Sequence, residues 1–164
     1  MTCVLIAEDN RQFAEMLRAS LEDAGYDVLT AYSGLAAVAC VEQNDVAAAV
    51  LDVLMPGISG DAVAERLRQI NPKLPVVLMT GSTERADRVR AIEAGADDFL
   101  TKPVDEIELK ARVRSLVRLK RYTDELDSAE TVILSLARTI EARDPYTEGH
   151  CERLARYAVV LVRR

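Results

Sequence analysis

The sequence predicts a doubly wound α/β domain followed by a long helical extension. Over residues 1–103, short apolar runs alternate with longer segments of helical periodicity. Runs such as VLIA, AAAVL and VVLM are almost continuously apolar, which is typical of parallel strands covered by helices on both faces. From Asp105 to about Arg143 the chain has neither glycine nor proline and is dense in charge, which favours a long helix.

The elements of the α/β part follow one another in order. Five apolar runs are assigned to strands: Cys3–Ala7, Tyr26–Thr30, Val46–Leu51, Val76–Thr80 and Asp98–Thr101. Four segments between them are assigned to helices: Arg11–Ala24, Leu35–Gln43, Gly60–Ile70 and Glu84–Ala94. In the first helix Phe13, Leu17 and Leu21 recur every four residues, as one buried face requires. Gly25 and Gly95 each follow a helical segment, where a left-handed C-terminal cap favours glycine. Five such repeats fit the flavodoxin-like order, in which ligands bind outside the carboxyl ends of the strands.

Composition argues against several classes of protein. The 164 residues suit one domain plus an appendage, and a net charge of -6 disfavours non-specific binding to nucleic acid or to an anionic membrane. No apolar run is long enough to span a bilayer, and the N-terminus lacks the basic region of a signal peptide. Cys3, Cys40 and Cys151 are odd in number and far apart, which predicts reduced thiols in a cytoplasmic protein.

Polar residues stand at the carboxyl ends of four predicted strands. Glu8-Asp9 ends the first strand, Asp52 the third and Thr80 the fourth, and Lys102 follows Thr101 at the end of the fifth. In a parallel sheet these ends lie along one edge. Three carboxylates there would repel one another unless a hard cation with oxygen ligands lay between them, and Mg²⁺ (or Mn²⁺) suits such a site.

This set of residues is suited to phosphoryl chemistry. An aspartate can act as a nucleophile toward phosphorus, and a lysine cation and a threonine hydroxyl can both engage a phosphoryl oxygen. A single aspartate after a strand is more often a helix N-cap. The occurrence of all these elements in this order favours a phosphoacceptor site centred on Asp52.

From Cys3 to about Arg121 the chain resembles the receiver domain of bacterial response regulators. The resemblance is carried by Glu8-Asp9, LDVLMPGISG with Asp52, MTGS with Thr80 and FLTKP with Lys102. It implies that Asp52 is phosphorylated and that Glu8, Asp9, Asp52 and the backbone carbonyl of Leu54 hold the metal ion. It also implies that Thr80 is the switch hydroxyl, that Lys102 pairs with the phosphoryl group and that the Lys102-Pro103 bond is cis. The implied donor is a sensor histidine kinase or a phosphotransfer protein.

Three further positions are compared with the family. Phe99 occupies the aromatic switch position but lacks a hydroxyl, so burial of its ring would have to couple it to Thr80. Leu54 and Ser82 flank the expected approach of water to the phosphoryl group and are expected to set the rate of autodephosphorylation. An apolar Leu54 suggests slow loss of the phosphoryl group.

The helical extension carries a heptad pattern of apolar residues. Alternating spacings of three and four are typical of the a and d positions of a coiled coil. One interpretation is an amphipathic helix that packs on its own domain. We favour a helix that pairs with its copy in a homodimer, through the seam residues Leu119, Tyr122, Leu126, Ala129, Ile133, Leu136 and Ile140.

Residues 136–164 resemble the beginning of an HD-GYP domain, the family of metal-dependent phosphodiesterases that hydrolyse cyclic di-GMP. The match rests on IEARDPYT and Gly149-His150, and it implies that His150 stands at a metal-ligand position. Since the chain has one histidine, we expect no phosphodiesterase activity from it. His150 could instead be a phosphotransfer histidine or a solvated capping residue. We assign 1–121 to the receiver, 122–143 to a helical linker and 144–164 to the HD-GYP fragment.

The leading hypothesis is a two-component response regulator that controls a downstream cyclic di-GMP phosphodiesterase through its linker. One alternative is a phosphorylation-independent dimerisation adaptor built on the same fold. Another is a haloacid-dehalogenase-like phosphatase, which would require a second aspartate two residues after the nucleophile, where Leu54 stands.

Overall fold

The computed structural model describes residues 2–81, 95–141, 153–154 and 156–157. The chain divides into two compact units, Met1–Lys120 and Arg121–Arg164. The predicted helix Glu84–Ala94 and most of the segment assigned to the HD-GYP fragment lie outside the described residues. No helix in the described part of the chain is long and apolar enough to cross a membrane.

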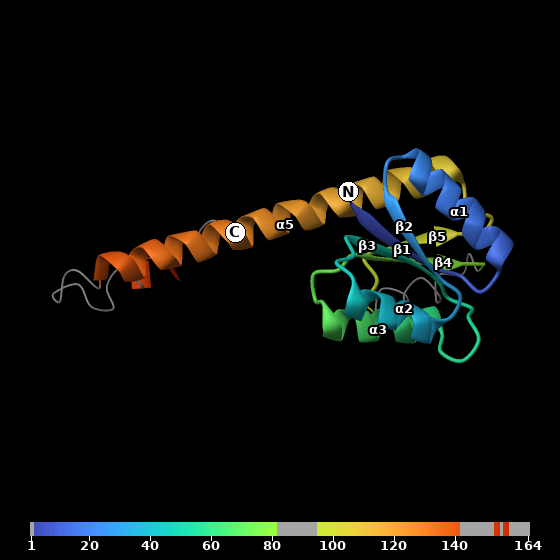
Figure 1. Ribbon diagram of the computed structural model, residues 1–164, viewed down its shortest axis with the longest axis horizontal. Helices are drawn as coiled ribbons and strands as arrows, with labels where there is room; N and C mark the ends of the chain where they lie inside the picture. Colours follow the sequence, from blue (N-terminus) through green and yellow to red (C-terminus); the bar gives the residue numbers. More distant parts are fainter. Residues whose placement is uncertain (1, 82–94, 142–152, 155, 158–164) are drawn as a thin grey trace. The chain divides into compact units, whose positions relative to one another are not determined.

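Five parallel strands form the sheet of the first unit, in the order β2-β1-β3-β4-β5 (Figure 1). This order confirms the predicted flavodoxin-like architecture. The strands are β1 (Cys3–Ala7), β2 (Asp27–Ala31), β3 (Ala48–Asp52), β4 (Val76–Thr80) and β5 (Asp98–Thr101).

The predicted bounds of β2 and β3 were wrong by one or two residues. Strand β2 pairs with β1 from Asp27 opposite Cys3 to Ala31 opposite Ala7, so Tyr26 lies before the ladder. Val46 is buried but precedes the pairing of β3, which begins at Ala48. Apolar runs report burial, whereas strand bounds are set by pairing, and the two differ at these ends.

Helices cover both faces of this sheet, as Figure 1 shows: α1 (Arg11–Asp23) and the start of α5 (Glu106–Glu141) on one, α2 (Gly34–Gln43) and α3 (Gly60–Ile70) on the other. Alternate strand residues point to opposite faces, so Leu5 and Ile6 belong to different clusters. The α2/α3 side is filled by Leu5, Leu51, Leu78, Val38, Val63 and Leu67, among others. The α1/α5 side is filled by Ile6, Val50, Met79, Leu17, Leu21, Leu109 and Val113, among others.

Local signals explain where the first two helices begin and how α1 ends. Asn10 caps α1 by accepting a hydrogen bond from the backbone N–H of Phe13, and Ser33 caps α2 in the same way. Gly25 follows α1 with a φ of +89°, a left-handed conformation that L side chains rarely adopt. The predicted left-handed backbone is confirmed there and at Gly95, whose φ is +87°.

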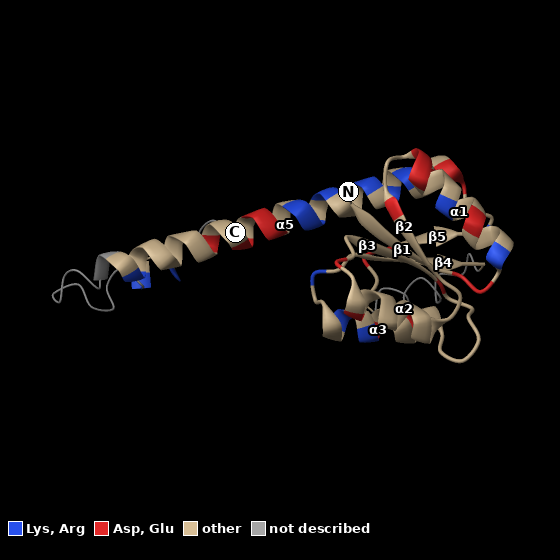
Figure 2. Ribbon diagram, in the orientation of Figure 1, with Lys and Arg blue, Asp and Glu red and all other residues tan. Residues whose placement is uncertain are grey.

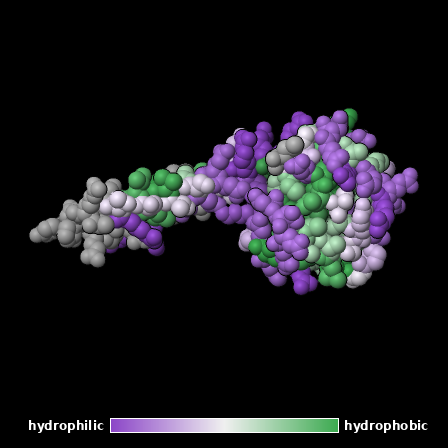
Figure 3. Space-filling model, in the orientation of Figure 1, coloured by the Kyte–Doolittle hydropathy of each residue, from purple (hydrophilic) through white to green (hydrophobic). Residues whose placement is uncertain are grey.

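Helix α5 is 36 residues long and confirms the predicted helical extension. Along it, Leu119, Tyr122, Leu126, Ile133 and Leu136 are each between 44% and 58% exposed, and Ala129 is exposed as well. The side chain of Ile140 lies outside the described residues. Figure 3 shows hydrophobic residues gathered on α5 toward its C-terminal end. The seam predicted for a dimer is therefore an exposed apolar stripe in this single chain.

Candidate functional site

Three carboxylates meet at the carboxyl edge of the sheet. One oxygen from each of Glu8, Asp9 and Asp52 lies within 4.8 Å of the others. Glu8 is 1% exposed and Asp52 4% exposed, whereas Asp9 is exposed to solvent. Figure 2 shows the acidic residues in the loop that follows β1. A cluster of hard oxygen donors at this spacing fits the ligand preference of Mg²⁺ or Mn²⁺.

Lys102 joins the two buried carboxylates. Its Nζ lies 2.8 Å from Oε2 of Glu8 and 2.9 Å from Oδ2 of Asp52. Burial raises the pKa of the Glu8 carboxyl, although hydrogen bonds from Lys102 and from the backbone of Asn10 act in the opposite direction. Burial lowers the pKa of the Lys102 ammonium, but its hydrogen bonds and charge interactions with Glu8 and Asp52 outweigh this, so the pKa is raised. Lys102 therefore stays charged beside the predicted phosphoacceptor.

Backbone packing holds Asp52 in place. Asp52 is the last residue of β3, and the next residue, Val53, donates its N–H to the carbonyl of Met79 on β4. The N–H of Leu54 donates to Oδ1 of Asp52 at 3.3 Å. Gly60, the first residue of α3, lies so close that a Cβ there would contact the carbonyl oxygen of Asp52. The side chain of Leu54 is 76% exposed.

The ends of β4 and β5 bring Thr80 and Lys102 to the same edge. Thr80 is 9% exposed, and its carbonyl accepts a hydrogen bond from the N–H of Lys102 at 2.7 Å. The Lys102-Pro103 bond is cis, which confirms that expectation. Phe99 lies on β5 opposite Leu78 of β4 and is partly buried. Ser82 and His150 lie outside the described residues.

Sequence reasoning missed two residues beside this cluster. The backbone N–H of Asn10 donates to Oε1 of Glu8 at 3.1 Å. The ammonium of Lys102 lies over the ring of Phe13, 5.0 Å from its centroid. The helical spacing assigned Phe13 to the buried face of α1 with Leu17 and Leu21, but it is only partly buried. No spacing rule could have shown that its ring faces Lys102.

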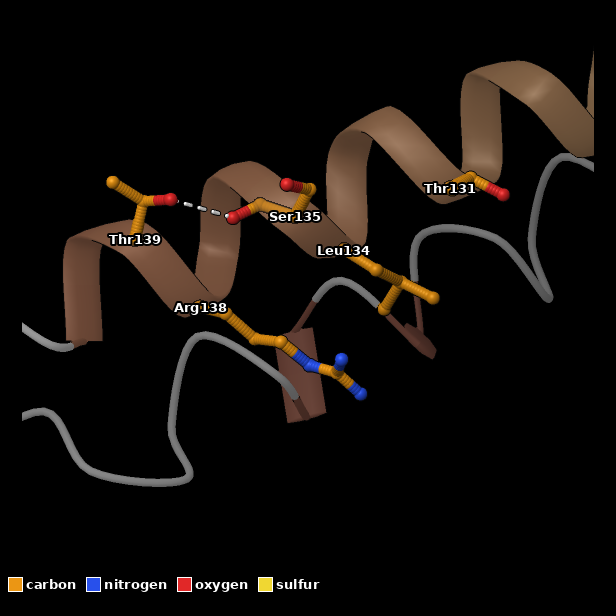
Figure 4. A pocket seen from close by; sticks show the side chains of 5 residues that line it. All are labelled: Thr131, Leu134, Ser135, Arg138 and Thr139. Carbon is orange, nitrogen blue, oxygen red and sulfur yellow. Dashed lines mark hydrogen bonds between the residues drawn. The ribbon is translucent and has the colours of Figure 1, made fainter.

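A separate cavity of about 510 Å³ adjoins α5 (Figure 4). The hydroxyl of Thr139 donates to the carbonyl oxygen of Ser135, and that of Thr131 to Asp127, so both are used within the helix. The lining residues that the structure describes include no carboxylate, the ligand type that hard divalent cations favour. They are Thr131, Leu134, Ser135, Arg138 and Thr139.

The chain is similar to known proteins over most of its length. Residues 4–114 match the family model described as the response regulator receiver domain. The transcriptional regulatory protein TctD of Salmonella typhimurium is 44% identical over 115 residues, which cover 70% of this chain and 51% of TctD. The response regulator PleD of Caulobacter vibrioides is 40% identical over 129 residues, which cover 77% of this chain and 28% of PleD.

Solved structures show the same likeness. The receiver domain of the Francisella response regulator 1452 has a TM-score of 0.69 at 29% identity, covering 72% of this chain and 98% of that one. A putative response regulator from Chloroflexus aurantiacus has a TM-score of 0.68 at 36% identity, covering 71% of this chain and 98% of that one. The chain thus spans a whole receiver structure but only about half the length of TctD.

Proposed function

This chain belongs to the response regulator receiver family, and from that membership we propose that Asp52 accepts a phosphoryl group from a sensor histidine kinase or a phosphotransfer protein. The observation that carries the proposal is the buried carboxylate of Asp52, which contacts Lys102 and lies beside Glu8 and Asp9. In the described part of the chain, this is the one group of three or more acidic, Cys or His side chains spaced to hold a metal ion.

The proposed step is a displacement at phosphorus. A carboxylate oxygen of Asp52 attacks the phosphorus of a phosphohistidine, a new O–P bond forms, and the N–P bond breaks. The imidazole nitrogen leaves with the electron pair of that bond. Lys102, already 2.9 Å from Oδ2 of Asp52, donates to a phosphoryl oxygen, and Thr80 supplies a hydroxyl from the next strand.

Glu8, Asp9, Asp52 and the backbone carbonyl of Leu54 would hold the divalent cation. Bound there, Mg²⁺ or Mn²⁺ would neutralise charge on the phosphoryl oxygens. The buried Glu8 already has one oxygen bound to Lys102 and the other to the N–H of Asn10. Asp9, which is exposed, is therefore the carboxylate most open to an entering ion.

A small phosphodonor tests the function. Incubation with acetyl phosphate and Mg²⁺ is expected to add the mass of one phosphoryl group, measured by intact mass spectrometry. Asp52→Asn and removal of Mg²⁺ with EDTA are each expected to abolish the addition. Asp45→Asn, which removes an exposed carboxylate before β3, serves as the matched control and should be modified normally. Addition that survives Asp52→Asn would refute the assignment.

The second part of the proposal is output through a homodimer of α5. Its support is the exposed apolar stripe from Leu119 to Leu136, which a paired helix would bury. Phosphorylation can bias this pair only if its contacts differ between two arrangements of the helices, such as two rotations or registers. Light scattering with and without beryllofluoride, a phosphoryl mimic, tests it, and a monomer in both states would rule the dimer out.

The third part concerns the output domain. The resemblance of residues 136–164 to an HD-GYP domain supports a downstream cyclic di-GMP phosphodiesterase in the parent protein. The decisive measurement is cyclic di-GMP hydrolysis by the parent protein, compared with its Asp52→Asn variant. Absence of hydrolysis in both phosphorylation states would remove this part of the proposal and leave the receiver function intact.

A further inference from the structure

Among the residues that the structure describes, the ammonium of Lys102 interacts with Glu8, Asp52 and Phe13. Glu8 and Asp52 accept its hydrogen bonds at 2.8 and 2.9 Å. The third is the ring of Phe13, with its centroid 5.0 Å from Nζ. At this distance the negative face of an aromatic ring attracts a cation, and the attraction grows where water is excluded. The Lys102 side chain is 27% exposed, so water reaches only part of it.

The position of the ring is tied to the same carboxylate that Lys102 contacts. The N–H of Phe13 donates to the side chain of Asn10 at 3.1 Å. The N–H of Asn10 donates in turn to Oε1 of Glu8, whose Oε2 accepts from Lys102. Glu8, Asn10, Phe13 and Lys102 therefore form a ring of contacts: each residue interacts with the next, and Lys102 interacts with Glu8 again. The start of α1 is thereby placed relative to Lys102 rather than only relative to the core.

Phe13 is not a typical core residue. Leu17, one turn further along α1, is fully buried, whereas Phe13 is partly buried. Together with Asn10, Gln12 and Met16 it lines a cavity of about 330 Å³. A leucine at position 13 could make the same apolar contacts with the α1/α5 side of the core, but it could not attract the ammonium of Lys102.

We propose that Phe13 is a positioning residue for phosphoryl transfer, which holds the Lys102 ammonium beside Asp52 before the phosphoryl group arrives. The inference rests on the proposed function of Asp52. Lysine carries a point charge on a flexible four-carbon side chain. Its contribution to phosphoryl transfer therefore depends on restricting the conformations of that side chain. The ring attracts the ammonium in addition to the two carboxylates and so further restricts the lysine side chain. It also attracts the charge without providing an acceptor that would compete with a phosphoryl oxygen.

Three variants separate this role from simple core packing. Phe13→Leu keeps the apolar volume but removes the ring, and it is expected to slow phosphorylation by acetyl phosphate and Mg²⁺ about threefold, the size of one partly exposed cation–π contact. Phe13→Tyr keeps the ring and is expected to restore the wild-type rate. Met16→Leu changes the same cavity without touching the ring and is the matched control. Thermal unfolding of each variant verifies that the fold is retained.

A second readout needs neither metal nor phosphodonor. In the Mg²⁺-free protein, the ring should shift the ε-methylene proton resonances of Lys102 upfield by NMR. Phe13→Leu should move them toward the values of Lys110, which is paired with Asp23 on the surface. Phe13→Tyr should leave them in place.

The outcomes distinguish the proposed function of Asp52 from the proposed role of Phe13. A wild-type chain that takes up no phosphoryl group contradicts the function of Asp52. A normal wild-type rate that Phe13→Leu shares, with unshifted Lys102 resonances, overturns the role of Phe13 alone. Equal slowing by Phe13→Leu and Phe13→Tyr also overturns it, because the ring would then not be the cause.

Discussion

The ammonium of Lys102 lies 2.8 Å from Oε2 of Glu8, although 94 positions of sequence separate the two residues. Glu8 is therefore both a predicted metal ligand and the charge partner of the site lysine. In the absence of a divalent cation, Lys102 supplies the positive charge that keeps Glu8 and Asp52 close together in a buried setting.

Lys102→Met is expected to destabilise the Mg²⁺-free protein by about 2 kcal/mol. Removing one partner from a buried ion pair leaves uncompensated charge, and the partial exposure of Lys102 reduces the usual cost of about 3–5 kcal/mol. Mg²⁺ should recover more stability in the variant than in wild type, because the cation replaces the missing charge. Urea unfolding with and without Mg²⁺ measures both effects. Lys110→Met is the control and should change stability little, because Lys110 is as exposed as Lys102 but its partner Asp23 is 77% exposed.

Gly60→Ala is expected to destabilise the fold by about 3 kcal/mol and to slow phosphorylation. The new Cβ would meet the backbone of Asp52 and lie 3.0 Å from the Cα of Val53, and backbone atoms cannot rotate away. Either the start of α3 or the end of β3, which carries Asp52, must then shift. Gly81→Ala adds the same methyl group where no atom lies within 4 Å. Equal unfolding midpoints for the two variants would contradict the packing argument.

Phe99→Ala is expected to weaken the response to phosphorylation without preventing phosphorylation itself. The partly buried ring of Phe99 lies on β5, next to the strand that carries Thr80. Alanine has no ring whose burial could change together with Thr80, so the coupling between the two positions is lost. The measurement is the beryllofluoride-dependent change in dimer fraction, alongside intact mass after acetyl phosphate. Phe99→Tyr retains a ring and is the control. A response in Phe99→Ala equal to that of wild type would show that the ring plays no part.

Glu130→Lys is expected to strengthen a parallel dimer of α5 several-fold. With the seam at a and d, Glu125 takes a g position and Glu130 an e position, which face each other across a parallel pair and repel. The substitution converts both symmetry-related contacts into attractive ones. Sedimentation equilibrium gives the dissociation constant. The double variant Glu125→Lys, Glu130→Lys restores like charges and should return to weak association. If both variants associate equally, the helices do not pair in this parallel register.

The order of strands and the acidic edge were predictable from the sequence for one physical reason. Parallel strands align their carboxyl ends, so polar residues that end different strands gather at one edge wherever the chain places them. Glu8, Asp52 and Lys102 lie together as that rule requires. The ends of β2 and β3 were missed because buried residues such as Val46 extend an apolar run beyond the hydrogen-bonded ladder.

The sequence by itself determined the architecture of this protein, because burial on two faces and periodicity along helices leave direct marks on residue order. It also determined which residue types gather at the sheet edge. Only the tertiary structure decided that Glu8 rather than Asp9 is buried against Lys102, that Phe13 lies beneath that ammonium, and that Gly60 contacts Asp52. Those relationships join distant elements at distances of a few ångströms. They depend on how helices pack onto the sheet, and no spacing along the chain encodes that packing.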